Sequence, residues 1–311
     1  MNETIRIGTR GSALAIWQAS WVKSRLESLH PGLQVELIGI KTRGDKILDV
    51  PLAKVGGKGL FVKELEESLL DLRTDLAVHS MKDVPSEFPN GLMLGAILER
   101  EDPWDVLLSV KHASLETLPM GAKVGSSSLR RQSQLLHLRP DLEVIPLRGN
   151  VNTRIDKLEK GQFDAILLAA AGVNRLGLLQ YVRQHMNLEQ MVPAAGQGAV
   201  GIEVRCDDQH ILNLIAPLDH LQTRVRVLAE RSFLAALEGG CQVPISSFAL
   251  LKQGQLHLTG RVGNLDGTKQ LTESVFGSIN APEELGKSLA AKLLHQGADQ
   301  ILAQIYRELD G

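Results

Sequence analysis

The stretch TIRIGTRGSALAIWQAS (residues 4–20) shows the pattern that the first hundred residues repeat. TIRIG alternates as a strand does, Ser12 is a favoured helix N-cap, and apolar side chains then recur at helical spacing. Those apolar side chains are Leu14, Trp17, Trp21 and Leu26. LQVELIGI (33–40) is a second strand. This β-α-β order predicts a mainly parallel sheet with helices on both faces.

The alternation continues and then restarts further along the chain. A helical stripe from Phe61 to Leu72 precedes the strand DLAVHSM (75–81), and the charged segment ILEREDPWD (97–105) is a plausible hinge. After it, strands and helices alternate again up to FDAILLAAAG (163–172). We therefore expect a second α/β domain that resembles the first in architecture, with the chain returning to the first domain near Pro193.

The C-terminal part has a different pattern. One helix (223–237) precedes three strand candidates, ISSFALL, QLHLTGRV and KQLTESVFGS, joined by the turn sequences KQG and NLDG. Two helical segments end the chain. The fold expected is α/β, with two α/β domains and a small α+β domain that contains a three-stranded antiparallel sheet. The expected boundaries are 1–98 with 199–216, then 104–192, then 221–311.

Composition limits the possible classes of function. The 311 residues carry a formal net charge of -2, so no global field draws the protein to nucleic acid or to an anionic membrane. No run of about 18 apolar residues is present, and the N-terminus lacks the pattern of a signal peptide. Two cysteines make no disulfide framework. We expect a cytoplasmic protein with reduced thiols.

Basic residues stand beside Gly or Ser at three strand-to-helix junctions: GTRGS (8–12), GSSSLRRQ (125–132) and LRGNVNTR (147–154). Helix N-termini bind anions through free N–H groups, and arginine in a first turn is otherwise unfavourable. Three matching junctions therefore favour an anionic ligand, although such arginines can also reach solvent or acidic neighbours.

Two glycine-rich stretches need separate interpretations. PLAKVGGKGLFVKELE (51–66) suggests a flexible lysine-bearing loop ahead of a helix, but its spacing is not that of a phosphate-binding P-loop. GQGAVG (196–201) matches the dinucleotide pattern, but no strand precedes it and a strand follows it. An interdomain crossing is the better interpretation.

AVHSMKDVP (77–85) ends a strand with polar residues. Ligands of open α/β sheets lie beyond the carboxyl ends of strands, so Asp83 is well placed for proton transfer or for stabilising a cation. A structural turn of Lys82 and Asp83 is the alternative. His79 is a lone histidine. No cluster of Cys, His and Asp has metal-ligand spacing, so no metal is expected.

ALEGGCQVPIS (236–246) places Cys241 in a glycine-flanked turn, where an accessible thiolate would be a strong nucleophile. The alternative is a small buried side chain. Cys206 lies beside two acids, which disfavour its thiolate, and is the weaker candidate.

Seven stretches, in this order along the chain, resemble the porphobilinogen deaminase (hydroxymethylbilane synthase) family over essentially its whole length. They are IGTRGSALAIWQA, TRGDKILDVPLAKVGGKGLFVKELE, DLAVHSMKDVPSEFPNGL, GSSSLRRQSQL, LRGNVNTR, AAGQGAVGIEVR and LEGGCQVPIS. The resemblance implies three domains, the first two like a type II periplasmic binding protein. It also implies a monomeric transferase of tetrapyrrole (haem) biosynthesis, which joins four porphobilinogen molecules head to tail and releases ammonia.

The resemblance also implies a cofactor and two central residues. A dipyrromethane would be held by a thioether to Cys241, which anchors it. Asp83 would assist loss of the amine and stabilise the cationic azafulvene-like intermediate. Basic and polar side chains would bind the acetate and propionate groups of the pyrroles, and Phe61 would stack on a ring. These residues are Arg10, Ser12, Lys54, Lys58, Ser80, Lys82, Ser128, Arg130, Arg131, Arg148, Gly149, Arg154, Arg175 and Gln197.

Two other classes of function are compatible with parts of this pattern. A non-catalytic anion-binding or sensor protein would share the fold, but it has no use for an acid in its anion site or for an anchored thiol. A cysteine hydrolase would need a His–Asp arrangement around Cys241, and none is evident.

Overall fold

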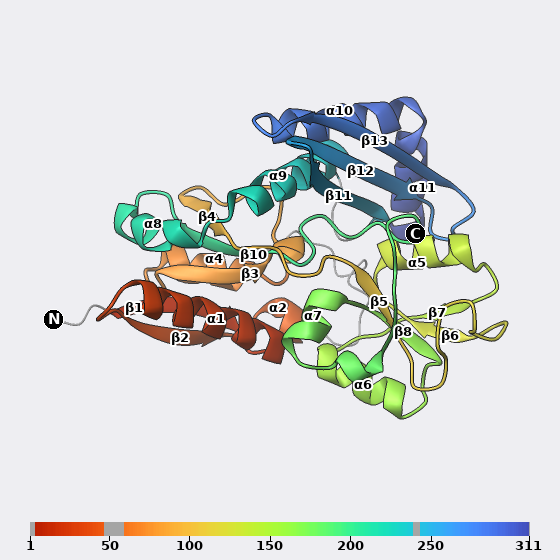
Figure 1. Ribbon diagram of the computed structural model, residues 1–311, viewed down its shortest axis with the longest axis horizontal. Helices are drawn as coiled ribbons and strands as arrows, with labels where there is room; N and C mark the ends of the chain where they lie inside the picture. Colours follow the sequence, from red (N-terminus) through yellow and green to blue (C-terminus); the bar gives the residue numbers. More distant parts are fainter. Residues whose placement is uncertain (1–3, 47–58, 239–242, 311) are drawn as a thin grey trace. The chain divides into compact units, whose positions relative to one another are not determined.

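The computed structural model describes residues 4–46, 59–238 and 243–310. These residues form two compact units, whose elements Figure 1 labels along the chain. The first unit contains the described residues of Met1–Leu48, Gly57–Glu101 and Ala199–Arg224. The second contains those of Asp102–Gly198 and Val225–Gly311.

The first unit is built on a five-stranded sheet with the order β2-β1-β3-β10-β4. Four strands point the same way, because β1 is parallel to β2 and β3 while β10 is antiparallel to both β3 and β4. The expected mainly parallel sheet is thus confirmed, with one reversed strand. The strands are β1 (Thr4–Arg10), β2 (Gln34–Ile40), β3 (Leu76–Ser80), β4 (Leu92–Ile97) and β10 (Val200–Arg205).

Short and long helices connect these strands. They are α1 (Ala13–Leu29), α2 (Arg43–Lys46), α4 (Lys63–Leu70), the 3-10 turn η1 (Met81–Asp83), α8 (Gln209–Ile215) and η3 (Ala216–Leu218). Ser12 caps α1, as predicted, by accepting a bond from the Ala15 amide. The predicted apolar stripe of α1 is only partly its buried face, however. Leu26 is buried as expected, whereas Trp17 and Trp21 are 37% and 39% exposed and the polar Gln18 is buried.

The second unit contains a sheet of the same architecture, with the order β7-β6-β8-β5-β9. Its strands are β5 (Asp105–Leu108), β6 (Lys123–Gly125), β7 (Glu143–Ile145), β8 (Ala165–Ala169) and β9 (Val182–His185). Its helices are α5 (Leu129–Leu138), α6 (Val151–Glu159), α7 (Ala170–Arg175) and η2 (Leu179–Tyr181). β5, like β10, is the reversed strand of its sheet. Each of these two strands follows a passage of the chain from one unit to the other, which explains why the reversal recurs.

The C-terminal part of the second unit is the expected three-stranded antiparallel sheet, β11-β12-β13. β11 (Ile245–Lys252) and β12 (Gln255–Gly263) join through Gln253 and Gly254, both with positive φ, as a tight hairpin requires. β13 (Gln270–Ser278) completes the sheet, and α10 (Pro282–His295) packs on β12 and β13. The other helices are α9 (Leu221–Ala236) and α11 (Ala298–Asp310). The fold class predicted from the sequence is therefore confirmed, while the three domain boundaries stay a prediction.

Buried polar contacts join the two sheets of the second unit. Glu230 of α9 is fully buried, and its carboxylate accepts bonds from the amides of Gly196 (2.7 Å) and Ala249 (2.8 Å). Arg261 of β12 donates to the Gln134 side chain of α5 at 2.8 Å. Because buried polar groups need partners, these bonds fix the C-terminal sheet against the arginine-bearing helix α5.

Candidate functional site

A pocket in the first unit gathers five of the predicted site residues. Its lining includes Arg10, Ser12, Phe61, Ser80 and Asp83. β1 ends at Arg10 and β3 ends at Ser80, so the pocket lies at the carboxyl ends of two parallel neighbouring strands. Ligands of open α/β sheets bind at this edge, which agrees with the position expected for Asp83.

Asp83 is the last residue of η1, directly after β3, and is half-buried. Ser80 is fixed by Gln18, whose amide Nε2 donates to the serine hydroxyl at 3.0 Å. Sequence reasoning missed Gln18, and the available signal was a polar residue on the helix that begins at the pocket. Lys82 is half-buried in the same turn as Asp83.

Arg10 has partners inside the first unit. Its guanidinium bonds the carboxylate of Asp45, with Nε 3.2 Å from Oδ1, and lies 4.2 Å from the centroid of the Phe61 ring. Burial alone would raise the pKa of Asp45, but hydrogen bonds from Arg10 and Thr42 outweigh it and hold the pKa below its usual value. Asp45 is therefore an ionised neighbour with which an anionic ligand at Arg10 has to compete.

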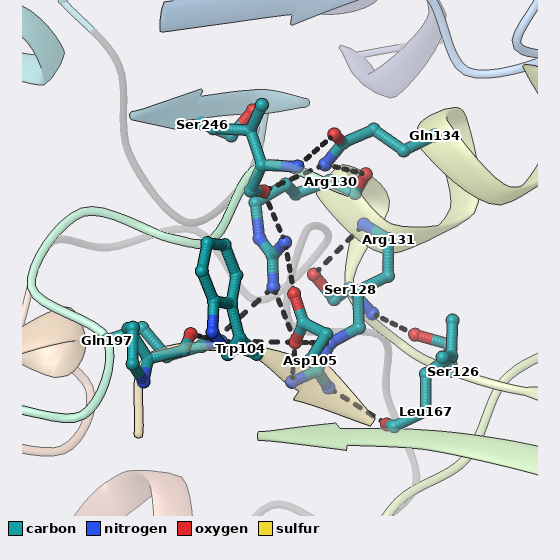
Figure 2. A network of polar contacts seen from close by, with 12 residues as sticks. Trp104, Asp105, Ser126, Ser128, Arg130, Arg131, Gln134, Leu167, Gln197 and Ser246 are labelled. Atoms are coloured by element: carbon teal, nitrogen blue, oxygen red, sulfur yellow. Dashed lines mark hydrogen bonds and ion pairs between the residues drawn. The ribbon is translucent and has the colours of Figure 1, made fainter. Parts of the chain in front are cut away.

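Arg130 and Arg131, predicted as ligand-binding residues, point into the second unit toward a shared carboxylate (Figure 2). Asp105, at the start of β5, accepts bonds from Arg130 Nη1 at 2.7 Å and from Arg131 Nε at 2.8 Å. Both arginines are only 6% exposed. They also donate to main-chain carbonyls, Arg130 to Val192 (2.8 Å) and Arg131 to Leu167 (3.0 Å).

The charge balance at Asp105 favours the ionised form. Complete burial alone would raise the pKa of Asp105, but the two guanidinium groups outweigh it and hold the pKa well below its usual range. Gln197, another predicted residue, is buried and donates to Pro103 O (2.7 Å) and to Asp105 Oδ1 (3.2 Å). Sequence reasoning missed Asp105. The alternative considered for these arginines, an acidic neighbour, describes the contacts that Arg130 and Arg131 make with Asp105.

The second basic junction is built as a capped helix start. Ser128 is the N-cap of α5 and accepts from the Arg131 amide at 3.4 Å. The half-buried hydroxyl of Ser128 thus has a structural partner at the place where a helix N-terminus would also meet an anion.

The third junction contains a buried donor, the Nη2 atom of Arg148. The Arg148 Nη2 atom is buried and has no hydrogen-bond partner among residues 4–46, 59–238 and 243–310. Burial lowers the pKa of Arg148. A buried donor of this kind fits a carboxylate ligand, such as those of a dipyrromethane.

The backbone beside Arg148 shapes this junction. Gly149 has φ +112, and a Cβ there would lie 2.7 Å from Thr153 Cγ2, so glycine is required. Arg154 Nε donates to the Gly149 carbonyl at 2.8 Å, which holds the turn. Arg175, at the end of α7, donates to the Gly198 carbonyl at 2.9 Å.

Three predicted residues, Lys54, Lys58 and Cys241, lie outside the described residues. Cys206 is exposed and is not in a disulfide. In the part of the chain that the structure describes, no group of three or more His, Cys, Asp or Glu side chains could hold a metal ion. In that same part, no helix combines the length and apolar character that crossing a membrane requires.

The fold and the pocket define an α/β protein with a carboxylate, Asp83, just beyond the carboxyl end of a parallel strand. Residues 5–213 match the family "Porphobilinogen deaminase, dipyromethane cofactor binding domain", and residues 224–295 match "Porphobilinogen deaminase, C-terminal domain". The chain belongs to the porphobilinogen deaminase family and has its transferase activity, that of a hydroxymethylbilane synthase.

Individual relatives agree with this assignment. A porphobilinogen deaminase of Nitratidesulfovibrio vulgaris is 57% identical over 306 residues, covering 96% of both chains. One of Geobacter metallireducens is 54% identical over 303 residues, covering 97% of this chain and 95% of the relative.

Among solved structures, a periplasmic substrate-binding protein from Coxiella burnetii has a TM-score of 0.44 at 15% identity, covering 69% of this chain and 91% of that one. A putative methionine-binding lipoprotein of Bacillus subtilis has a TM-score of 0.43 at 13% identity, covering 70% and 90%.

Proposed function

We propose that this chain joins porphobilinogen molecules head to tail at Asp83, primed by a dipyrromethane that a thioether links to Cys241. The observation that carries the proposal is the pocket at the ends of β1 and β3, which Asp83 shares with Arg10, Ser12, Phe61 and Ser80. When bound, the dipyrromethane supplies a free pyrrole carbon to which the first substrate is joined.

Each condensation forms a carbon–carbon bond between the aminomethyl carbon of one porphobilinogen and the free pyrrole carbon of the preceding ring. It breaks the carbon–nitrogen bond of the aminomethyl group, ammonia leaves, and the pyrrole carbon that forms the new bond loses its proton. Positive charge develops on the substrate as the amine departs. The Asp83 carboxylate stabilises this charge, because a fixed anion placed where positive charge develops lowers the barrier.

The arginines divide into two kinds in this proposal. Arg148 binds a carboxylate of the pyrroles, because its buried Nη2 has no partner in the described part of the chain. Arg130 and Arg131 hold the start of α5 through their bonds to Asp105. Ligand carboxylates bind the guanidinium N–H groups of these arginines that those bonds do not use. The other residues predicted to bind cofactor and substrate are Ser12, Lys54, Lys58, Lys82, Ser128, Arg154 and Arg175, together with Gly149 and Gln197.

Intact-mass measurement of the purified protein tests the cofactor. We expect an excess mass equal to one dipyrromethane, absent from Cys241→Ser. An unmodified protein with full activity would contradict the proposal that Cys241 anchors the cofactor.

We also expect a monomer by light scattering, a cytoplasmic location by cell fractionation, and no retention on nucleic acid.

Asp83→Asn tests the catalytic role. The variant is expected to keep the cofactor mass and to lose nearly all turnover, because it removes the charge and leaves the shape. Glu87→Gln is the control, since Glu87 is an exposed acid four residues further along. Near-normal turnover of Asp83→Asn would remove Asp83 from this role.

A further inference from the structure

Three acid–base side chains that the proposed reaction does not use are buried together in the first unit. Glu66 of α4, His79 of β3 and Glu203 of β10 are 8%, 5% and 1% exposed. His79 Nε2 lies 2.9 Å from Glu203 Oε2. Neither His79 Nε2 nor the other carboxylate oxygen, Glu203 Oε1, has a hydrogen-bond partner among the described residues, so the close approach of His79 and Glu203 is a charge contact rather than a hydrogen bond. Burying charged groups this deeply is unfavourable.

Glu66 is the member of this cluster that changes its charge near neutral pH. Burial, and then the nearby Glu203, raise the pKa of Glu66 to about 7, while His79 counteracts the increase. Two exposed side chains of the same helix have smaller and opposite effects, Glu67 raising the pKa and Lys63 lowering it. Loss of the Glu66 proton therefore adds one negative charge to this cluster.

His79 connects this cluster to the reaction pocket. It lines the same pocket as Asp83 and Ser80, and it directly precedes Ser80 on β3. The charged groups that line the pocket on its other sides are Arg10 and Asp83. In a buried setting, a change of one charge behind the pocket wall is poorly screened and acts on charge that develops inside it.

We infer that Glu66, His79 and Glu203 form a buried acid–base cluster that tunes the Asp83 pocket, and that ionised Glu66 favours turnover. This inference rests on the proposed role of Asp83, because the cluster acts on the same developing positive charge. Glu66, His79 and Glu203 are positioning residues here. The negative charge of ionised Glu66 adds to the stabilisation that Asp83 supplies, so the rate rises as Glu66 loses its proton.

The first test is the pH profile of kcat between pH 5.5 and pH 9 for the holoenzyme. We expect the wild-type rate to rise about threefold to tenfold through a limb centred near neutral pH. Glu66→Gln keeps the shape of the side chain but cannot ionise, so it should lose this limb and stay near its low-pH rate. Glu67→Gln, the exposed neighbour, should keep the limb. A Glu66→Gln profile that rises like that of the wild type would overturn the inference.

The second test needs no turnover. Glutamate labelled with ¹³C at the carboxyl carbon is followed by NMR through a pH titration, and the Glu66 signal is assigned by its absence in Glu66→Gln. We expect a midpoint near neutral pH that moves up in His79→Gln and down in Glu203→Gln. A Glu66 signal that titrates below pH 5, or that neither variant moves, would refute the cluster even in an Asp83→Asn background. The two proposals therefore fail separately.

Discussion

Replacing Asp105 by Asn should destabilise the second unit severely, although the two side chains have nearly the same shape. Asp105 is fully buried, and it is the shared counter-charge of Arg130 and Arg131. Asn removes that charge and leaves two guanidinium groups in a site that is only 6% exposed. Breaking a buried ion pair by removing one partner typically destabilises a protein by about 3–5 kcal/mol. That is a large part of the total free energy of unfolding of about 5–15 kcal/mol.

The structure provides a local reporter for this experiment. Trp17 and Trp21 belong to the first unit, whereas Trp104 is next to Asp105 and its ring lies 4.9 Å from that of Phe248. With Trp17 and Trp21 replaced by Phe, tryptophan fluorescence in urea follows the second unit. This local signal is useful because a chain of two units need not unfold in one transition.

A control variant and a pH series test this prediction further. Glu284→Gln breaks an ion pair with Lys287 whose side chains are 72% and 61% exposed, and it should change the free energy of unfolding by less than about 1 kcal/mol. The pKa of Asp105 is lowered from 3.8 in the folded state, so its contribution to stability is complete well above pH 3.8 and is lost as the pH falls below that value. The difference between wild type and Asp105→Asn should therefore be constant from pH 7 to about pH 5 and narrow as the pH falls from about 4 toward 3. A loss below about 1 kcal/mol at pH 7, or a difference that stays constant in acid, would refute the charge-pair account.

Four other substitutions have defined outcomes. Glu66→Gln should raise the free energy of unfolding by up to about 3 kcal/mol at pH 8 and little at pH 5. The reason is that the raised pKa of Glu66 destabilises the folded state only as the pH rises from about 4.5 toward 7. Urea unfolding at the two pH values checks this. Arg148→Met should leave the melting temperature unchanged or higher while lowering the cofactor mass signal, whereas Arg131→Met should lower the melting temperature sharply. Glu230→Gln should destabilise the second unit by about 2–3 kcal/mol. The two backbone N–H groups bond different oxygens of the Glu230 carboxylate, and an amide has only one oxygen to accept them. The Trp104 fluorescence in urea measures the loss of stability.

The elements of the fold could be predicted because their signals are local. Ser12 and Ser128 both cap helices at the positions that their sequences indicate. The turn sequence KQG gave the first hairpin of the C-terminal sheet. What local patterns do not contain is the direction in which a helix faces. Trp17, Trp21 and Leu26 of α1 have the spacing of a buried stripe, yet only Leu26 of the three is buried, and the other buried residues of the helix are Gln18, Ala19 and Val22.

The candidate site shows the same limit. The pocket around Asp83 could be anticipated, because the carboxyl ends of parallel strands meet at one edge of a sheet. Asp105 could not, since it follows Pro103 in a charged connecting segment, and its partners are 25 and 26 residues away. Nothing in the sequence near Asp105 shows that a carboxylate there is buried. The buried Glu66–His79–Glu203 cluster was missed for the same reason, because its members come from three separate elements.

The internal partners of the arginines have a consequence for an enzyme whose anionic product lengthens stepwise. In the proposed function, a carboxylate that binds at Arg10 competes with Asp45, and one that binds near Arg130 and Arg131 meets two cations, one of whose charges Asp105 already balances. The free energy gained at such a site is reduced by the ion pair that is already present, so it is smaller than that of an arginine without a carboxylate partner. If these arginines bind the ligand as proposed, a growing chain leaves them more readily than it leaves Arg148, whose buried Nη2 has no partner in the described part of the chain. The proposal then gives firm holding of a resident group to Arg148 and passing contacts to Arg10, Arg130 and Arg131.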